Sequence, residues 1–507
     1  MTPEPALDAF AAAYRRGEAQ VVWTRIVDDL ETPVSAFLKI AHGRPYAFLF
    51  ESVEGGAFRG RYSFVAMKPD LIWRCFGDRA EVADDESLGV FRPEPGGALA
   101  SLRALIAGAR ISLPAELPPM AAGVFGTLGY DMVRLVERLG DPNPDPLGLP
   151  DSVMMRPSIV AVFDALKQEI VLVTPVRPDG RSAEAAYTDA TARLADTAGD
   201  LVRPTPKRTA PERQVQTPLA SPVSRAAYGE VVERAKGYIR AGDIFQVVPS
   251  HRFSAPFTLD PFAFYRALRR LNPSPYMYFL NFGDFQLAGS SPEILVRLRD
   301  GKVTIRPIAG TRPRGATPEQ DLALERELLA DDKEIAEHQM LLDLGRNDVG
   351  RAVMLREEGR NNRPEPGRPR VRVTERFTVE RYSHVMHIVS NVEGDAPEGL
   401  DPVDVILTAL PAGTLSGAPK VRAMQIIDEL ETVKRGVVYA GCAGYISAAG
   451  EVDAAIVLRT ALFKDGHMHV QAGGGVVVDS DPDAEYEETL HKSAALKRAA
   501  EEAWRFG

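Results

Sequence analysis

A proline-rich segment at residues 203–222 is the feature that most limits how this chain can fold. The segment contains five prolines and almost no large apolar side chain. Proline fixes the backbone angle φ and removes an amide donor, so the segment is expected to be a linker or an exposed excursion. The sequence therefore predicts an N-terminal region at residues 1–202, a linker at 203–222 and a second region at 223–507.

Both regions mix patterns typical of strands with patterns typical of helices. Apolar runs predict strands at 46–51, 158–163, 169–174, 436–446, 451–463 and 467–471. Helical patterns predict helices at 101–109, 183–201, 228–241, 318–348 and 482–504. Because strands and helices do not alternate strictly, the predicted fold class is α+β.

The composition argues against several kinds of partner and location. The net charge is −10 with both signs interspersed, which argues against binding to nucleic acid or an anionic membrane. The two cysteines, Cys75 and Cys442, are far apart in the sequence, so we expect no disulfide framework and a reducing cytoplasm. No signal-peptide pattern and no uncharged apolar stretch of about 18 residues is present, so a cytoplasmic protein is predicted.

Two pairs of acidic residues have the spacing of one helix face. Glu334 and Glu337 are three positions apart, Glu485 and Glu488 repeat this spacing, and Lys492 follows Glu488 by four positions. If the two pairs faced each other, they would form the oxygen-rich kind of site that Mg²⁺ prefers. Such pairs are more often solvated surface, so these residues alone leave both interpretations open.

Three short loops, at 309–311, 412–419 and 471–476, combine glycine with small or hydroxyl-bearing residues. Backbone amides without bulky side chains can approach a carboxylate closely, although each loop alone also fits a tight turn or a bulge. The chain has neither a GxxxxGK[ST] phosphate loop nor a GxGxxG loop between strand and helix. These loops are therefore not nucleotide-binding loops, and for each loop taken alone a tight turn or bulge is the favoured interpretation.

Three further residues are candidates for chemistry. His387 lies in an apolar, strand-like run and is either a hydrogen-bonded core residue or a base. Arg459 also lies in an apolar run, where it needs either an internal acid or a bound carboxylate as its partner. Glu293 follows two serines and a proline, where it could be an acid or a simple cap.

Four segments together closely resemble one known family. They are PIAGTRPRG (307–315), KEIAEHQMLLDLGRNDVGR (333–351), LPAGTLSGAPKVRAM (410–424) and QAGGGVVVDSDPDAEYEETLHK (471–492). These segments resemble the chorismate-utilising enzymes and, within them, the anthranilate synthase component I family. The resemblance extends from about residue 46 to the C-terminus.

This resemblance implies a fold of packed antiparallel sheets with surrounding helices, in which the two halves of the chain are interwoven. It also implies a Mg²⁺-dependent lyase, in which Glu337 and Glu488 bind the metal directly with support from Glu334 and Glu485. The implied substrate-binding residues are Gly310, Thr311, Thr414, Tyr439, Arg459, Gly473, Gly474 and Gly475. Glu293 is implied to be the general acid at the C4 hydroxyl of chorismate, and His387 the base that removes the C2 proton, whereas the role of Lys492 near the metal stays open.

Two positions distinguish between the reactions of this family. Relatives that make aminodeoxychorismate typically have a nucleophilic lysine where this chain has Ala309, which cannot be a nucleophile. Relatives that add water, giving isochorismate or salicylate, typically have a lysine that acts as the general base. The matching position in this chain is Gln246, whose amide cannot take a proton. Both residues favour attack by ammonia over these alternatives. A catalytically silent regulatory subunit is not favoured either, because no metal-binding glutamate is missing.

The resemblance also implies two regulatory and assembly features. No glutaminase machinery is present in the sequence, so a separate glutamine amidotransferase subunit is expected to supply ammonia within a hetero-oligomer. Feedback inhibition by L-tryptophan is expected at a site formed by Glu51, Ser52, Arg61, Pro275, Tyr276 and Met277. There a carboxylate and a hydroxyl would hold the amino group and the Pro-Tyr-Met segment would wall the indole. Without the resemblance, a strand edge packed on a turn would be the favoured explanation of these residues.

Overall fold

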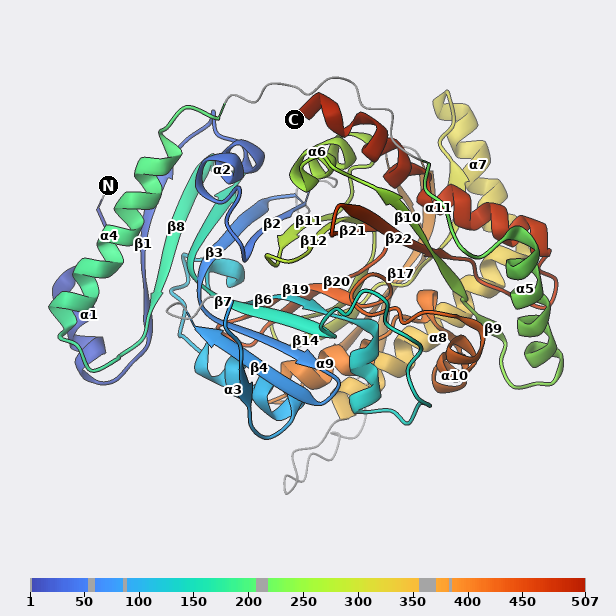
Figure 1. Cartoon of the computed structure of the whole chain (residues 1–507), viewed down its shortest axis with the longest axis horizontal. Coiled ribbons are helices and arrows are strands. Elements are labelled where there is room, and N and C mark those ends of the chain that lie inside the picture. Colours follow the sequence, from blue (N-terminus) through green and yellow to red (C-terminus); the bar gives the residue numbers. More distant parts are fainter. Residues whose placement is uncertain are drawn as a thin grey trace.

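The structure is a computed structural model that describes residues 2–52, 60–84, 89–206, 218–354, 371–382 and 385–506. One large antiparallel sheet dominates it and divides into two arms at its two longest strands, β3 (Tyr62–Phe76) and β7 (Ser152–Asp164) (Figure 1). These strands pair with each other over most of their length, and the register of β3 shifts between Pro69 and Leu71. A bulge of this kind bends a strand, so neighbours on either side of it diverge into different arms.

The first arm is built from strands of both halves of the chain. Beyond β7 it continues through β8 (Glu169–Val176) to β1 (Gln20–Val27). Beyond β3 it continues through β2 (Ala47–Glu51), β11 (Tyr276–Asn281), β12 (Gln286–Ser291), β21 (Thr460–Lys464), β22 (His467–Gly473) and β10 (Ser250–Pro256).

The second arm leaves the other ends of the same two strands. Beyond β3 lie β4 (Arg79–Asp84) and β5 (Arg92–Glu94). Beyond β7 lie β6 (Gly123–Leu128), β19 (Cys442–Ser447), β20 (Val452–Ile456), β13 (Ile294–Arg299), β14 (Lys302–Ile305) and β17 (Val385–Asp395). β15 (Ile308–Pro313) and β16 (Val371–Arg381) both pair with β17. A separate short pair joins β9 (Gln246–Val247) to β18 (Gly417–Ala418).

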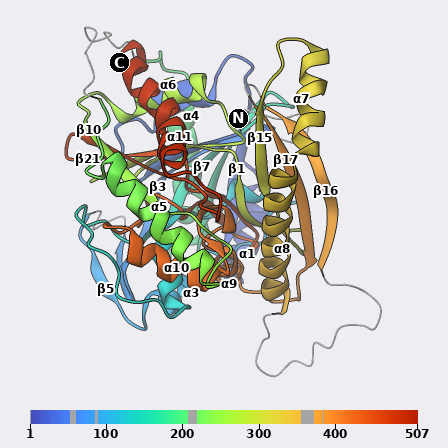
Figure 2. The same cartoon turned by 90° about the vertical axis from the view of Figure 1, so that its right-hand side faces the viewer.

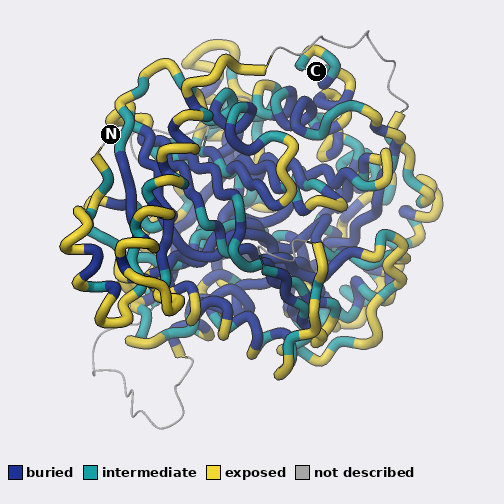
Figure 3. Tube along the Cα trace, turned by 60° about the vertical axis from the view of Figure 1, so that its left-hand side comes forward, coloured by how far each residue is buried: buried dark blue, intermediate teal, exposed yellow. Residues whose placement is uncertain are grey.

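Three large apolar cores hold these layers together, and the buried trace fills the interior of the molecule (Figure 3). The innermost core joins side chains from both arms, for example Phe64, Phe125, Tyr278 and Tyr445. Each arm has a further core on its outer face, under helices. Burial of this apolar surface is the main driving force of the fold.

The helices lie mostly outside the sheet. The first arm is covered by α1 (Leu7–Arg15), α2 (Pro33–Ile40), α4 (Ala183–Leu201), α6 (Pro261–Leu271) and α11 (Pro482–Glu502). The second is covered by α3 (Ala98–Gly108), α8 (Asp332–Met354) and α9 (Pro402–Ala409). α5 (Arg225–Arg240) packs on α10 (Lys420–Leu430), and α7 (Pro318–Ala330) precedes α8 beside β15 and β17 (Figure 2).

The expected α+β fold with two interwoven halves is confirmed. Strand β2 of the first half pairs with β11 of the second, and β6 pairs with β19 in the same way. The predicted domain boundary itself stays a prediction, since residues 207–217 of the expected linker are outside the described residues. No helix among the described residues is long and apolar enough to span a membrane.

The strand expected at 436–446 begins only at Cys442, after a turn in which Ala440 has a φ of +62°. Two further elements differ from the prediction for local reasons. The helix expected at 318–348 is two helices, because Asp331 leaves the helical conformation and its carboxylate accepts hydrogen bonds from the amides of Lys333 and Glu334, at 3.1 and 3.2 Å. The strand expected at 451–463 is interrupted between β20 and β21, where Arg459 has a φ of +46°. The spacing of apolar residues predicts neither a helix cap at Asp331 nor a left-handed backbone conformation at Arg459.

Candidate active site

Helices α8 and α11 bring the two predicted acidic pairs together. Glu334 and Glu337 lie in the first turns of α8, and Glu485 and Glu488 in the first turns of α11. Asp481 caps α11 by accepting a hydrogen bond from the amide of Ala484 at 2.9 Å, and Pro482 occupies its first turn.

Mutual repulsion shows that these carboxylates lie close together. Burial raises the pKa of Glu337, and the charges of Glu334 and Glu488 raise it further. Burial also raises the pKa of Glu485, and Glu488 adds to the rise. Glu485 accepts a hydrogen bond from Ser480 at 2.7 Å through Oε1, but its buried Oε2 has no hydrogen-bond partner in the described part of the chain. A cluster with this excess of negative charge is suited to a cation.

Lys492 and Arg312 balance part of that charge. The Lys492 ammonium is 2.7 Å from Oε1 of Glu488 and donates a hydrogen bond to the Gly473 carbonyl at 2.8 Å. The Arg312 guanidinium is 3.2 Å from Oε1 of Glu334. Among the described residues, no three His, Cys, Asp or Glu side chains already have the geometry of a metal centre.

The loop at 473–475 follows β22 and lies between these two helices. A Cβ atom on Gly474 would lie 2.5 Å from Oε2 of Glu485, and one on Gly475 would lie 2.5 Å from Nε2 of Gln246. A Cβ on Gly473 would lie 2.4 Å from the carbonyl oxygen of Pro249. The three glycines are thus required by close approach to the carboxylates and to the backbone, rather than by a turn conformation.

A second cluster surrounds Glu293, which lies just before β13. Its side chain is buried and accepts a hydrogen bond from Oγ1 of Thr414, 3.2 and 3.3 Å from the two carboxylate oxygens. Burial raises the pKa of Glu293 to about 8, although Thr414 and the charge of Arg459 oppose the rise. Glu293 is therefore mainly protonated at neutral pH and can donate a proton.

His387 lies in β17, opposite Thr311 of β15, where a bulge between Ala309 and Thr311 includes Gly310 with a φ of +72°. Its Nδ1 is 3.1 Å from the Gly310 carbonyl oxygen and 3.0 Å from Oγ1 of Thr311. Since a carbonyl can only accept, the favoured tautomer has its proton on Nδ1 and leaves Nε2 as an acceptor. Burial lowers the pKa of His387 to about 4, helped by Arg459, so the ring is neutral at pH 7.

The two clusters belong to one site. A Cβ atom on Gly310, beside His387, would lie 3.2 Å from Oε2 of Glu334 in the acidic cluster. Arg459 acts electrostatically on both Glu293 and His387, and its left-handed φ is a strained conformation typical of functional positions. Buried Tyr439 is close enough to Lys492 and Glu488 for their charges to act on its pKa. The structure thus brings together the predicted metal, substrate and catalytic residues.

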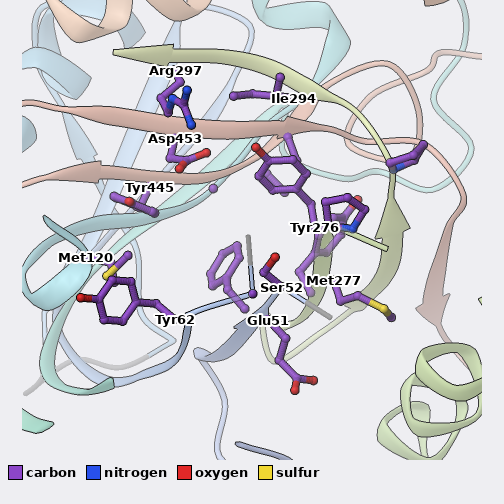
Figure 4. A pocket seen from close by; sticks show the side chains of 18 of the residues that line it. Glu51, Ser52, Tyr62, Met120, Tyr276, Met277, Ile294, Arg297, Tyr445 and Asp453 are labelled. Carbon is purple, nitrogen blue, oxygen red and sulfur yellow. The ribbon is translucent and has the colours of Figure 1, made fainter. Parts of the chain in front are cut away.

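The six residues predicted to bind tryptophan line a different cavity, with a volume of about 420 Å³, between the two arms (Figure 4). They are Glu51, Ser52, Arg61, Pro275, Tyr276 and Met277. Tyr445, Asp453 and Arg297 line it as well. The cavity also contacts Pro292 and Ile294, the two neighbours of Glu293, and Ile308 of β15. One short stretch of chain therefore connects this cavity with the second cluster.

Two of the six residues already have charged partners inside the protein. The Glu51 carboxylate points away from the cavity (Figure 4) and is paired with Arg269, at 2.9 Å, and with the Tyr265 hydroxyl. Arg61 is likewise paired with Asp164 at 2.7 Å. Glu51 therefore contributes to the cavity wall with a charge that Arg269 balances, and its contact with a ligand amine stays a prediction.

Several residues that complete these sites were not predicted as site residues. Ser480 orients Glu485, and Gln246 donates to Oε1 of Glu337 at 3.4 Å. Asp453 brings to the tryptophan cavity a carboxylate oxygen, Oδ1, with no hydrogen-bond partner among the described residues. An acid inside an apolar strand run, as at Asp453, is the one signal that could have indicated a site, because a buried charge needs a partner.

Comparisons with known proteins agree on one family. A family model described as chorismate binding enzyme matches residues 98–498. The chain is 56% identical to anthranilate synthase component 1 of Cereibacter sphaeroides, with 98% of each chain covered, and 49% identical to that of Pseudomonas putida, with 93% covered. Among solved structures, anthranilate synthase component I from Streptococcus pneumoniae TIGR4 matches with a TM-score of 0.74 at 36% identity, over 93% of this chain and 98% of that one.

Proposed function

The chain belongs to the chorismate-binding enzymes and, within them, to the anthranilate synthase component 1 family, and we propose how its two clusters divide the reaction. Its function is that of the large subunit of anthranilate synthase, in the first step of tryptophan biosynthesis. The proposal rests on one observation. A cluster of carboxylates suited to a cation lies in the same site as a buried, protonated Glu293 beside Arg459.

The acidic cluster fits Mg²⁺. Its donors are hard carboxylate oxygens, they repel one another, and Oε2 of Glu485 is buried without a hydrogen-bond partner in the described chain. Glu337 and Glu488 would hold the ion directly, with Glu334 and Glu485 in support. When bound, the metal supplies a template and a Lewis acid for the ring carboxylate of chorismate.

The second cluster acts on the rest of the ring. Arg459 and the 473–475 backbone hold the enolpyruvyl carboxylate, beside Tyr439, while Gly310, Thr311 and Thr414 line the ring. Glu293 gives its proton to the C4 hydroxyl, which leaves as water while ammonia forms a bond to C2. His387 then takes the C2 proton through Nε2, so that pyruvate leaves and the ring becomes aromatic. The protein is on this basis a Mg²⁺-dependent lyase.

Ammonia is the proposed nitrogen source, supplied by a separate glutamine amidotransferase subunit in a hetero-oligomer. The name component 1 of the relatives supports a second component. A cytoplasmic location follows from the same biosynthetic role. Ala309 and Gln246 disfavour the lysine-dependent chemistries of aminodeoxychorismate and isochorismate synthases, and every predicted catalytic residue is present, which disfavours a silent subunit.

The 420 Å³ cavity is the proposed feedback site for L-tryptophan. Tyr276, Met277 and Tyr445 offer apolar walls for an indole. Asp453 pairs with Arg299 at 3.1 Å through Oδ2, but its Oδ1 has no hydrogen-bond partner among the described residues and is the proposed acceptor for the amino group. The guanidinium of Arg297, for which the described residues provide no hydrogen bond or ion pair, is placed to receive the carboxylate (Figure 4).

The central test is a fluorescence assay of anthranilate with purified chain, chorismate, MgCl₂ and ammonium. Glu337→Ala and Glu488→Ala should abolish turnover while the protein stays folded. Glu487→Ala is the matched control, because Glu487 is on the same helix but pairs with Arg225 at the surface. Near-normal activity of either ligand variant at limiting Mg²⁺ would show that the metal assignment is wrong.

A further inference from the structure

A small cavity lies behind Glu293, on the side of α8 and α9. Its volume is about 30 Å³, and Glu293, Thr414 and Asp348 are its polar lining residues, among apolar side chains such as Leu341 and Leu344. A water molecule needs roughly 10–15 Å³ and two to four polar partners in a protein interior. The cavity therefore has both the room and the polar groups for one or two waters.

At this cavity, one carboxylate oxygen of Asp348 lacks a hydrogen-bond donor. Its Oδ2 accepts from the Lys420 ammonium at 2.8 Å, but its buried Oδ1 has no hydrogen-bond partner among the described residues. Lys420 directs its remaining protons to the carbonyls of Thr408 and Ala409, at 3.4 and 3.3 Å. Leaving a buried carboxylate oxygen without a donor is costly, and the protein groups nearby do not supply one.

We propose that the cavity holds ordered water that donates to both Asp348 and Glu293, so that Asp348 sets which oxygen of Glu293 carries its proton. This inference rests on the proposed role of Glu293 as the general acid. It makes Asp348, together with Lys420, a positioning residue rather than a catalytic one.

An ionised Asp348 can only accept hydrogen bonds. Burial raises the pKa of Asp348, but the ammonium of Lys420 opposes that rise and favours the ionised carboxylate. A water bound to it points one proton at Asp348, and in the proposed arrangement its second proton goes to Glu293. The Glu293 oxygen on the cavity side is then an acceptor, so the proton of the carboxyl group lies on its other oxygen. In the proposed arrangement that other oxygen faces the C4 hydroxyl.

Glu293 needs such an orienting partner because Thr414 does not discriminate. Its hydroxyl is at nearly equal distances, 3.2 and 3.3 Å, from the two oxygens of Glu293. Without a second contact the proton could reside on either oxygen, and only one position allows proton transfer to the departing hydroxyl. Orientation of the proton is as necessary for general acid catalysis as a suitable pKa.

A crystal structure of the wild-type chain tests the hydration directly. Density for water within hydrogen-bond distance of Oδ1 of Asp348 and of Glu293 is expected. A dry cavity, or water bonded to only one of the two carboxyl groups, would overturn the proposal.

Kinetics test the function with a change that alters no charge. Ala409 lines the cavity, so Ala409→Val should fill it and displace the water. We expect kcat to fall about tenfold, since general acid catalysis contributes roughly 10²–10⁴-fold, while KM for chorismate stays within about twofold. Ala352→Val is the control, because Ala352 is equally buried in the same apolar core but does not line the cavity.

Asp348→Asn provides a second variant in which the amide can donate to the water and so reverse its orientation. A similar fall in kcat with unchanged KM is expected. Measuring thermal unfolding shows whether the fall in kcat is instead due to a loss of folded protein. If wild type makes anthranilate and Glu293→Gln does not, but Ala409→Val matches Ala352→Val, the water link is refuted and the proposed function stands. If wild type makes no anthranilate, the proposed function itself fails.

Discussion

Adding one methyl group at Gly474 should disable metal use without unfolding the protein. The added Cβ would lie 2.5 Å from Oε2 of Glu485, whereas ordinary contacts begin at 3.4 Å. The carboxylate must therefore move by roughly 1 Å, away from the position from which it would support the ion. Since Oε2 is the far end of a flexible side chain, the movement costs about 0.5–1.5 kcal/mol in rotamer strain.

The effect on metal binding should be larger than this cost in stability. Changes to groups around a metal typically reduce its affinity about 10–100-fold, which corresponds to about 1.4–2.7 kcal/mol. Titrating MgCl₂ in the ammonium-dependent fluorescence assay should show the concentration for half-maximal rate rise by that factor, with a nearly unchanged unfolding midpoint.

Gly473→Ala is an informative contrast. There the Cβ would lie 2.4 Å from the carbonyl oxygen of Pro249, which is backbone and cannot swing away. That variant should lose about 1–3 kcal/mol of stability by overpacking. An unchanged Mg²⁺ titration for Gly474→Ala would refute the placement of Glu485 beside the ion.

Four other outcomes are expected. The isolated chain should form anthranilate from ammonium but not from glutamine; glutamine-dependent activity of rigorously purified chain would contradict a separate amidotransferase. His387→Asn should let an aminated, non-aromatic intermediate accumulate, detectable by mass spectrometry, because it removes the base that takes the C2 proton. The rate per free ammonia should fall as pH rises through about 8, because Glu293 must be protonated to act and loses its proton there; a flat profile from pH 7 to 9 would argue against it. Ser52→Phe should relieve tryptophan inhibition with little loss of turnover, since Ser52 lines the inhibitor cavity and not the catalytic clusters; full sensitivity would exclude that cavity.

Sequence patterns predicted the elements that depend on local periodicity. The helix at 183–201 has the same bounds in the structure, and the acidic pairs lie on helices as their spacing indicated. What the sequence could not indicate were contacts between distant segments. Nothing near Glu51 in the chain predicts that Arg269 neutralises it, and nothing near Asp453 predicts a carboxylate oxygen free to face a ligand.

Unusual backbone conformations could not be predicted from the sequence either. Arg459 interrupts an otherwise uniform apolar run because its φ is +46°, a conformation that tertiary contacts impose on a residue with no preference for it. Family resemblance, and not periodicity, identified which residues in the glycine loops and around His387 share one site. The structure then supplied the physical reasons, such as the 2.5 Å separation between a Cβ on Gly474 and Glu485.

The pairing of β2 with β11 and of β6 with β19 has a consequence for synthesis on the ribosome. When the first half has emerged, β2 and β6 each have one edge with no partner, and the partner of β6 is more than 300 residues further along the chain. Exposed strand edges are templates for aggregation, and contacts so distant in sequence form slowly. The free edge of β6 therefore stays exposed until nearly all of the chain has been made. Expression as two separate polypeptides divided at residues 203–222 should yield insoluble halves that become soluble only when they are produced together.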